Sequence, residues 1–336
     1  MKIKILISAL AAASFISAHP AMAEDKPAEQ AKPVTEQLVD TLTTLSGGPH
    51  AGFRSNHAKG VMLEGSFKPS AQAASISKAA HLQKAESPVL VRFSDATGVP
   101  NIPDANGNAF PKGIAIRFQL QDGLSTDIVS ISINNFPAAT PEDFLGLLNA
   151  VRDSQNSTAK PSPVEQFLAS HPAALKFVTT PKPAPVSFAT QPFFGVNAFK
   201  FTNAAGQSVY GRYQIIPVAG AQYLSKEATD AAAPDYLMTD IAERVKKQSV
   251  QYKLLLQIAE QGDEVNNATV QWPETRKTVE LGTLTLKTVV ADSKAKEKTL
   301  MFNPLQLTEG IEASQDPILL ARPTAYAVSF GRRLGK

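Results

Sequence analysis

Residues 88–133 read PVLVRFSDATGVPNIPDANGNAFPKGIAIRFQLQDGLSTDIVSISI and indicate the fold class. Within it, three short runs are rich in β-branched and aromatic residues, namely Pro88 to Ser94, Gly113 to Leu120 and Asp127 to Ile133. Glycine, proline, asparagine and aspartate separate the runs, as is typical of connections between strands. The stretch therefore predicts an antiparallel sheet.

Further strand patterns follow in the second half of the chain. They cover 198–202, 208–217, 250–259 and 279–290, and the first two are joined by an Asn-Ala-Ala-Gly turn. Together with the first three runs, they favour a closed antiparallel barrel of about eight strands over a series of βαβ units. Such a barrel has room for side chains or for one small ligand.

Helical patterns surround these strands, so the fold class is α+β, mainly β. The predicted helices cover 34–45, a segment that opens at Thr140-Pro141, 163–170, 234–248 and 317–333. Residues 179–192 contain four prolines. These prolines predict an extended connector over the surface.

The first 23 residues have the pattern of a secretory signal peptide. Lys2 and Lys4 precede an apolar run, and Ala21-Met22-Ala23 ends the segment as a small-x-small cleavage site. The apolar run contains serines and is shorter than the roughly 20 residues that a membrane anchor needs. We therefore expect cleavage after Ala23, export to the periplasm, a flexible leader over 24–33, and one domain over 34–336 without a membrane span.

Composition excludes several classes of protein. The chain has 33 basic and 30 acidic residues, and removal of the two lysines in the signal peptide leaves a charge near +1. This balance is too neutral for a nucleic-acid-binding protein. With no cysteine, the chain has no disulfide, thiolate metal site or cysteine nucleophile. Because 43% of the residues are hydrophobic, the chain can bury a substantial core.

Two constellations of residues could carry chemistry. One is Arg54-Ser-Asn-His57-Ala-Lys-Gly60, and the other is Arg322-Pro-Thr-Ala-Tyr326 near the opposite terminus. An arginine four residues before a tyrosine on a helix shares one face with it, and the guanidinium favours the phenolate form. Taken alone, however, this pair is better described as a packed helical tyrosine, and a single histidine is more often structural than catalytic.

Taken together, the motifs resemble the haem-binding core of the catalases. They are Arg-x-x-His-Ala-Lys-Gly around His57, Arg92-Phe93-Ser94, Pro111-Lys112-Gly113, and Arg322-x-x-x-Tyr326 with Arg333 seven residues later. Their order also matches. The resemblance extends from about Val34 to the C-terminus, includes residues 193–210, and is closest to the short catalase-related peroxidases.

The resemblance implies a haem b cofactor, iron protoporphyrin IX, and a role for each matching residue. Tyr326 would ligate the iron as a phenolate, and Arg322 would hydrogen-bond that phenolate. His57 would act on the opposite face as general base and then acid, and Ser94 would orient its imidazole. The haem propionates would be neutralised by three arginines, Arg54, Arg92 and Arg333.

One position departs from the catalase pattern. Catalases carry a distal asparagine shortly after an Asp-Leu-Val strand, whereas an ungapped match places Ile131 there. Asn134 and Asn135 follow three and four positions later, so a local bulge would be needed to bring one back. This departure predicts weak catalase turnover.

The resemblance therefore implies a haem peroxidase that acts in oxidative stress defence. It would reduce hydrogen peroxide or an alkyl hydroperoxide with electrons from an organic donor that the sequence does not identify. The alternatives are a catalase-fold hydroperoxide isomerase and a non-enzymatic barrel that binds haem or an apolar ligand. Because the chain lacks the segments that tie full catalases into tetramers, we expect a monomer or homodimer.

Overall fold

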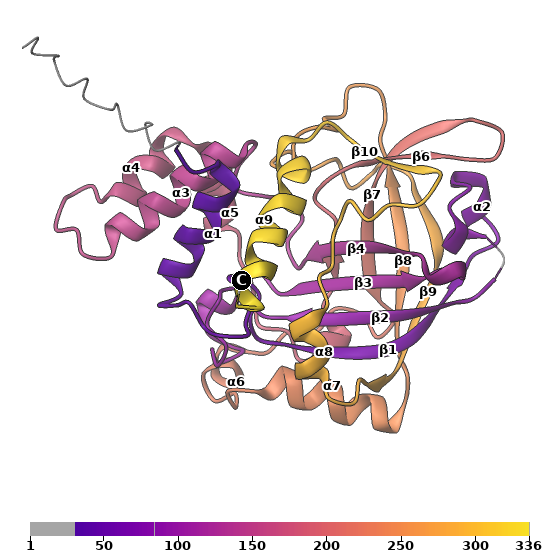
Figure 1. The fold of residues 1–336 in the computed structure, drawn as a ribbon, viewed down its shortest axis with the longest axis horizontal. Coiled ribbons are helices and arrows are strands. Elements are labelled where there is room, and N and C mark those ends of the chain that lie inside the picture. Colours follow the sequence, from indigo (N-terminus) through magenta and orange to yellow (C-terminus); the bar gives the residue numbers. More distant parts are fainter. Residues whose placement is uncertain (1–30, 84, 336) are drawn as a thin grey trace, which may run out of the picture. The chain divides into compact units, whose positions relative to one another are not determined.

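The structure is a computed structural model that describes residues 31–83 and 85–335 (Figure 1). The expected signal peptide over 1–23 and most of the leader over 24–33 lie outside these residues. Two units divide the chain, Met1–Lys32 and Pro33–Lys336. The helices and strands described lie in the second unit.

Eight antiparallel strands close into a barrel, as the sequence predicts. Strand β1 pairs with β2 on one side and β9 on the other, and the β7–β8 pairing closes the ring. The barrel strands are β1 Gly60–Pro69, β2 Ser87–Ser94, β3 Gly113–Gln119, β4 Ser125–Ile131, β5 Phe193–Phe194, β7 Ser208–Pro217, β8 Val250–Ile258 and β9 Thr278–Val289. Strands β6 Phe199–Thr202 and β10 Ile311–Ala313 extend the sheet beyond β7.

Helices pack around the barrel, and α1, α3 and α9 stand together beside β3 and β4 (Figure 1). The longer helices are α1 Val34–Leu45, α3 Pro141–Ser154, α4 Pro163–Ser170, α5 Pro172–Thr179, α7 Tyr236–Lys247 and α9 Pro317–Arg333. The shorter ones are α2 Ala73–Ile76, α6 Lys226–Asp230 and α8 Ser293–Thr299, with single 3₁₀ turns at 80–82, 107–109, 121–123 and 188–190. All five predicted helices are confirmed.

Side chains fill the barrel interior. Along β2, Val89, Val91 and Phe93 join the central hydrophobic core, whereas Arg92 and Ser94 alternate with them and face outward. The Phe93 ring stacks on Phe188 with centroids 4.9 Å apart. Burying each such side chain stabilises the fold by roughly 1.5–3 kcal/mol. The sequence allows a barrel filled by side chains or one that holds a small ligand. In the structure, side chains fill the barrel.

The prediction of a surface connector over 179–192 is wrong in its second half. Ser187 and Phe188 are fully buried, and the Tyr252 hydroxyl donates a hydrogen bond to the Phe188 carbonyl. The prolines do prevent a long helix, but they carry no information about burial. The apolar ring of Phe188 packs in the central core against Phe93, where it is more stable than in water.

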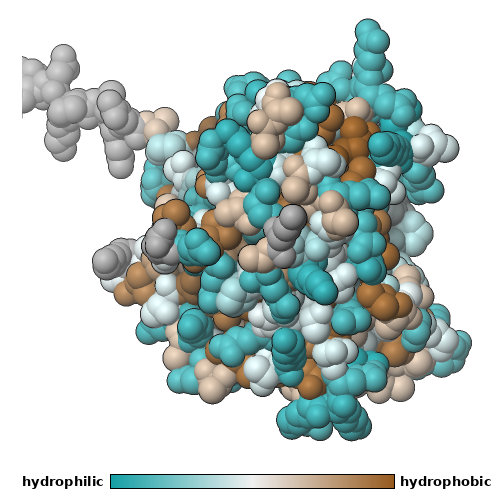
Figure 2. Space-filling view, turned by 90° about the vertical axis from the view of Figure 1, so that its right-hand side faces the viewer, coloured by the Kyte–Doolittle hydropathy of each residue, from teal (hydrophilic) through white to brown (hydrophobic). Residues whose placement is uncertain are grey.

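The surface visible in Figure 2 is mostly hydrophilic, with small and separate hydrophobic areas. Single exposed apolar side chains, such as Leu124 and Val218, are normal on a protein surface. None of the helices in residues 31–83 and 85–335 is both long and apolar enough to cross a bilayer.

Candidate active site

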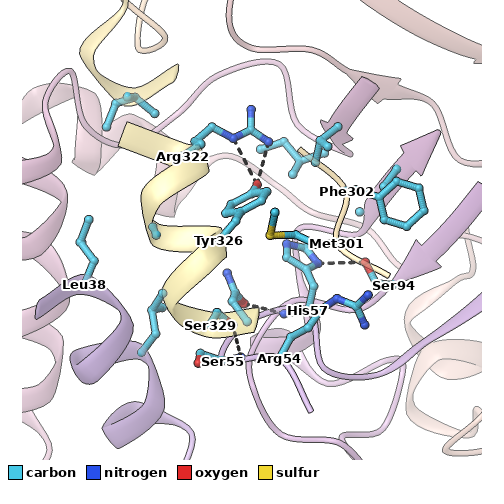
Figure 3. Close-up of a pocket in the computed structure, with 18 of the residues that line it drawn as sticks. Leu38, Arg54, Ser55, His57, Ser94, Met301, Phe302, Arg322, Tyr326 and Ser329 are labelled. Atoms are coloured by element: carbon cyan, nitrogen blue, oxygen red, sulfur yellow. Dashed lines mark hydrogen bonds between the residues drawn. The ribbon is translucent and has the colours of Figure 1, made fainter. Parts of the chain in front are cut away.

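The main cavity lies outside the barrel, between β3 and β4 and the helices α1, α3 and α9 (Figure 3). Its volume is about 280 Å³. A single water needs only roughly 10–15 Å³, so the cavity has room for an extended organic group. All seven residues singled out in the sequence line it: Arg54, His57, Arg92, Ser94, Arg322, Tyr326 and Arg333.

His57 reaches the cavity from the loop before β1, which holds it in an unusual backbone conformation. Its φ is +55°, and Thr97 on the neighbouring loop has a φ of +71°. The Asn56 Oδ1 atom accepts hydrogen bonds from both backbone N–H groups, at 3.0 Å from His57 and 2.7 Å from Thr97. Positive φ values outside glycine cost free energy and persist only where surrounding contacts fix them. The Asn56 side chain provides those contacts.

The imidazole of His57 rests on a glycine. The Ser94 Oγ lies 3.0 Å from His57 Nδ1, and a Cβ at Gly113 would come within 2.7 Å of Ser94 Oγ and 2.9 Å of His57 Nδ1. Only glycine leaves this space. Gly60 plays the same part beneath the Arg92 guanidinium, where a Cβ would lie 2.5 Å from Nη2. Gly60 and Gly113, the last residues of the two motifs, are therefore needed because no side chain fits at either position.

Burial keeps the His57 imidazole neutral. Its partial exposure is toward the cavity, and the surrounding protein lowers its pKa from 6.5 to about 3. Desolvation is the largest cause, and the positive charges of Arg92 and Arg54 add to it. A neutral imidazole at physiological pH can accept a proton.

Tyr326 faces the cavity from α9, and a chain of hydrogen bonds fixes its hydroxyl. Arg322, one turn earlier, donates to the Tyr326 oxygen from Nε at 3.1 Å and Nη2 at 2.9 Å (Figure 3). Arg322 Nη1 donates to Asn197 Oδ1 at 2.8 Å, and Asn197 Nδ2 donates to Asp316 Oδ2 at 2.9 Å. Asp316 Oδ1 also caps α9 by accepting from two backbone N–H groups at 2.9 and 3.4 Å. Asp316, the N-cap residue of α9, thus orients the Arg322 guanidinium through Asn197.

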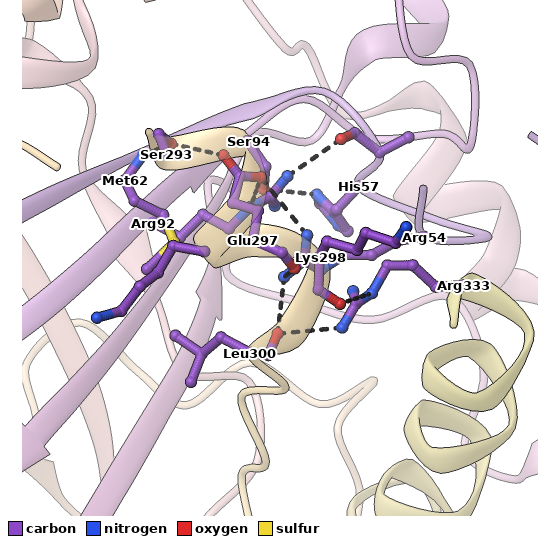
Figure 4. Close-up of polar contacts among 12 residues, drawn as sticks. Arg54, His57, Met62, Arg92, Ser94, Ser293, Glu297, Lys298, Leu300 and Arg333 are labelled. Carbon is purple, nitrogen blue, oxygen red and sulfur yellow. Dashed lines mark hydrogen bonds and ion pairs between the residues drawn. The ribbon is translucent and has the colours of Figure 1, made fainter. Parts of the chain in front are cut away.

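Three arginines gather at one edge of the cavity (Figure 4). Arg92 Nε donates to Glu297 Oε2 at 2.6 Å, and Arg54 Nη1 lies 3.5 Å from the same oxygen. Arg54 and Arg333 also donate to backbone carbonyls at the C-terminal end of α8. Burial and mutual repulsion hold the pKa of Arg54 well below its usual range, and burial lowers that of Arg333 to about 10.

This arrangement fits haem. Arg54 and Arg92 pair with one carboxylate, Glu297, and Arg333 donates to backbone carbonyls. Three guanidiniums and one carboxylate leave two positive charges at this edge for an anionic group such as a pair of propionates. Apolar side chains from α1, α3 and β4 form much of the wall. In the part of the chain that the structure describes, no three His, Cys, Asp or Glu residues could hold a metal ion.

The structure also places residues that the sequence analysis did not identify. Asn197 lies within the segment 193–210 that contributes to the resemblance, and Asp316-Pro317 has the signature of a helix N-terminus. Glu297 could not be found from a local pattern, because its partner Arg92 is distant in sequence, and Asn56 depends in part on Thr97, 41 residues away. At the departure from the catalase pattern, Ile131 lines the cavity, whereas the residues that line it do not include Asn134 or Asn135.

Comparisons with known proteins agree with this geometry. The family model "Catalase" matches residues 50–336. The catalase-related peroxidase of Mycolicibacterium paratuberculosis is 31% identical over 89% of this chain and 95% of its own length. That of Synechococcus elongatus is 32% identical over 87% of each chain. A fungal catalase crystal structure superposes with a TM-score of 0.76 over 89% of this chain and 63% of its own, at 22% identity. This chain belongs to the catalase family.

Proposed function

We propose that the protein is a haem b peroxidase that reduces hydrogen peroxide or organic hydroperoxides with electrons from an organic donor, in defence against oxidative stress. One observation carries this proposal. A tyrosine hydroxyl fixed by Arg322 and the neutral imidazole of His57 enter the same cavity. The two relatives named as catalase-related peroxidases support the same activity.

Residues on two sides of the cavity would hold the haem. Tyr326 would bind the iron as a phenolate, and the two hydrogen bonds from Arg322 stabilise that charged form. Three arginines would pair with the propionates: Arg54, Arg92 and Arg333. When bound, haem supplies an iron centre that takes two oxidising equivalents from a peroxide and returns them to a donor singly.

His57 would move the peroxide proton. Its unprotonated imidazole accepts the proton from one peroxide oxygen and returns it to the other, which leaves when the O–O bond breaks. Ser94 Oγ, 3.0 Å from Nδ1, holds the ring, which lines the cavity. Proton transfer by a positioned side chain contributes typically about 10²- to 10⁴-fold in rate.

We further propose that catalase turnover is weak. Ile131 lines the cavity at the position where the family resemblance places an asparagine, and an isoleucine side chain offers no hydrogen bond to a second peroxide. Electrons would then come from the organic donor. A hydroperoxide isomerase would use the same residues and differs in its product, so it stays the alternative. The packed barrel interior gives no support to a ligand-binding barrel.

We also propose that the protein works in the periplasm. The sequence pattern over 1–23 supports a signal peptide cleaved after Ala23, with a single domain over 34–336. A monomer or homodimer is the proposed assembly.

An assay with three simultaneous readouts tests the activity. Haem-loaded protein is given hydrogen peroxide and guaiacol, and peroxide loss, guaiacol oxidation and oxygen release are followed. We expect guaiacol oxidation to account for most of the peroxide consumed. Oxygen release at half the rate of peroxide loss would instead show catalase turnover. In the same assay with a fatty-acid hydroperoxide in place of hydrogen peroxide, consumption of the hydroperoxide without guaiacol oxidation would favour the isomerase.

A further inference from the structure

Asn56, the residue before His57, is among the residues that line the cavity. Its Oδ1 atom accepts two backbone N–H groups, from His57 and Thr97. These two donors also fix which branch of the amide is oxygen, because an NH₂ group in that place would face two N–H groups. The Nδ2 branch therefore points away from the backbone of both loops.

The Nδ2 atom of Asn56 has polar hydrogens without a protein acceptor. Asn56 is partly buried, and no hydrogen bond links Nδ2 to any residue that the structure describes. Nδ2 is also not among the sealed, unpaired polar atoms, so solvent or a ligand can reach it. An unpaired donor beside a cavity is available to a molecule bound there.

The loop also fixes the direction of this donor in advance. Two hydrogen bonds to Oδ1, of 3.0 and 2.7 Å, hold the plane of the amide, and the same bonds fix the backbone of His57. Asn56 and His57 are consecutive residues, and the same two hydrogen bonds position the Nδ2 donor and the imidazole. A donor that is already oriented stabilises developing negative charge without reorganisation, which is the most effective form of electrostatic catalysis.

We propose that Asn56 is a catalytic residue whose Nδ2 donates a hydrogen bond to the peroxide held beside His57. This inference rests on the proposed peroxidase function. The imidazole takes and returns the peroxide proton, while the amide stabilises negative charge on the peroxide oxygen. Asn56 donates a hydrogen bond but transfers no proton, so the proton balance of the reaction is unchanged.

Two variants separate the donor from the loop contacts. Asn56→Asp keeps an oxygen for the two backbone N–H groups and replaces Nδ2 by a second oxygen, whereas Asn56→Ala removes both branches. The control is Asn106→Asp, because Asn106 is exposed and its Oδ1 likewise accepts one backbone N–H, from Asn108 at 2.9 Å. Each protein is loaded with haem b, and three properties are measured: the absorption spectrum, the thermal midpoint, and the C–O stretching frequency of the ferrous carbon monoxide complex.

We expect both Asn56 variants to raise the C–O frequency, because a donor to the bound ligand is lost, and to slow the reaction with peroxide roughly 10- to 100-fold. Since Asn56→Ala carries no charge, a shared rise excludes a charge effect of the aspartate. Only Asn56→Ala should lower the thermal midpoint, and the control should match wild type. An unchanged frequency and rate in Asn56→Asp would overturn the role of Asn56. Wild-type protein without a haem spectrum would overturn the proposed function as well.

Discussion

At the residue scale, the site depends on glycine, which leaves space for neighbouring side chains, as much as on its polar residues. Gly113 on β3 lets the His57 ring and Ser94 Oγ approach the sheet, and no other residue fits because a Cβ would lie 2.7 Å from Ser94 Oγ. Ser94 is buried, and the His57 ring could yield only toward the cavity. The position of the imidazole is therefore set by the strand beneath it.

We predict that Gly113→Ala displaces His57 and lowers peroxidase activity at least tenfold. It should also cost about 1–3 kcal/mol of stability, as overpacking of a tight site does. Gly107→Ala is the matched control, because a Cβ there meets nothing within 4 Å. Steady-state guaiacol oxidation and urea unfolding measure the two effects. Full activity in Gly113→Ala would show that the ring position is not fixed by this contact.

The depressed pKa of His57 predicts an unusual pH profile. An ordinary histidine base loses activity below pH 6.5, whereas this imidazole stays unprotonated down to about pH 3. Because the unfolded chain takes up that proton near pH 6.5 and the folded chain does not, this residue also makes the fold less stable as pH falls from 6.5 toward 3. The rate constant for the reaction with peroxide should therefore be level between pH 5 and 8, which rapid-mixing kinetics can measure. A fall in this rate constant centred near pH 6.5 would contradict the lowered pKa of His57.

At the element scale, α9 carries Arg322 and Tyr326, and hydrogen bonds through Asn197 link these residues to the N-terminal cap of the helix. Asp316 caps the helix with one oxygen and holds Asn197 with the other. Asp316→Ala should therefore lose about 1 kcal/mol of stability from the cap and weaken haem binding through Arg322. Asn is an equally good cap, so Asp316→Asn should keep the stability but still perturb the contact with Asn197. Unfolding curves and haem titrations of the two variants provide the test, and equal haem affinity in all three proteins would contradict the coupling.

Elements with a clear local pattern could be predicted from the sequence, and elements without one could not. The helix over 163–170 and that over 317–333 have the observed bounds, because their caps and apolar spacing are local. Strand β1 was missed: its glycines and terminal proline weaken the strand pattern, and its pairing with β9 shifts register between Glu64 and Gly65.

The same distinction holds for the site. Seven cavity residues could be named from motifs, because the resemblance covers both ends of the chain. The barrel interior, by contrast, was left open between side chains and a ligand, and the place of the cavity outside it was not predicted. Glu297 could not be found, since it pairs with Arg92, 205 residues away in sequence, and only the closed barrel brings α8 to β2.

At the scale of the whole molecule, a sequence with the pattern of a signal peptide precedes a domain without cysteine. Because the chain has no cysteine, no disulfide supports the fold, and its stability depends on its packed core. We predict that the exported protein begins at Glu24. Intact-mass measurement on the periplasmic fraction checks this, and a mass that retains Met1–Ala23 in that fraction would contradict the predicted cleavage.

The central claim is that Tyr326 ligates haem iron in the cavity beside α9. The most direct measurement is the absorption spectrum of haem-loaded protein compared with Tyr326→Phe, which removes only the oxygen. Tyr210→Phe, at a half-exposed tyrosine on β7, is the control. We predict a high-spin ferric haem spectrum in wild type and control that is lost or altered in Tyr326→Phe. A spectrum that is the same in all three proteins, or no stoichiometric haem in wild type, would contradict the claim.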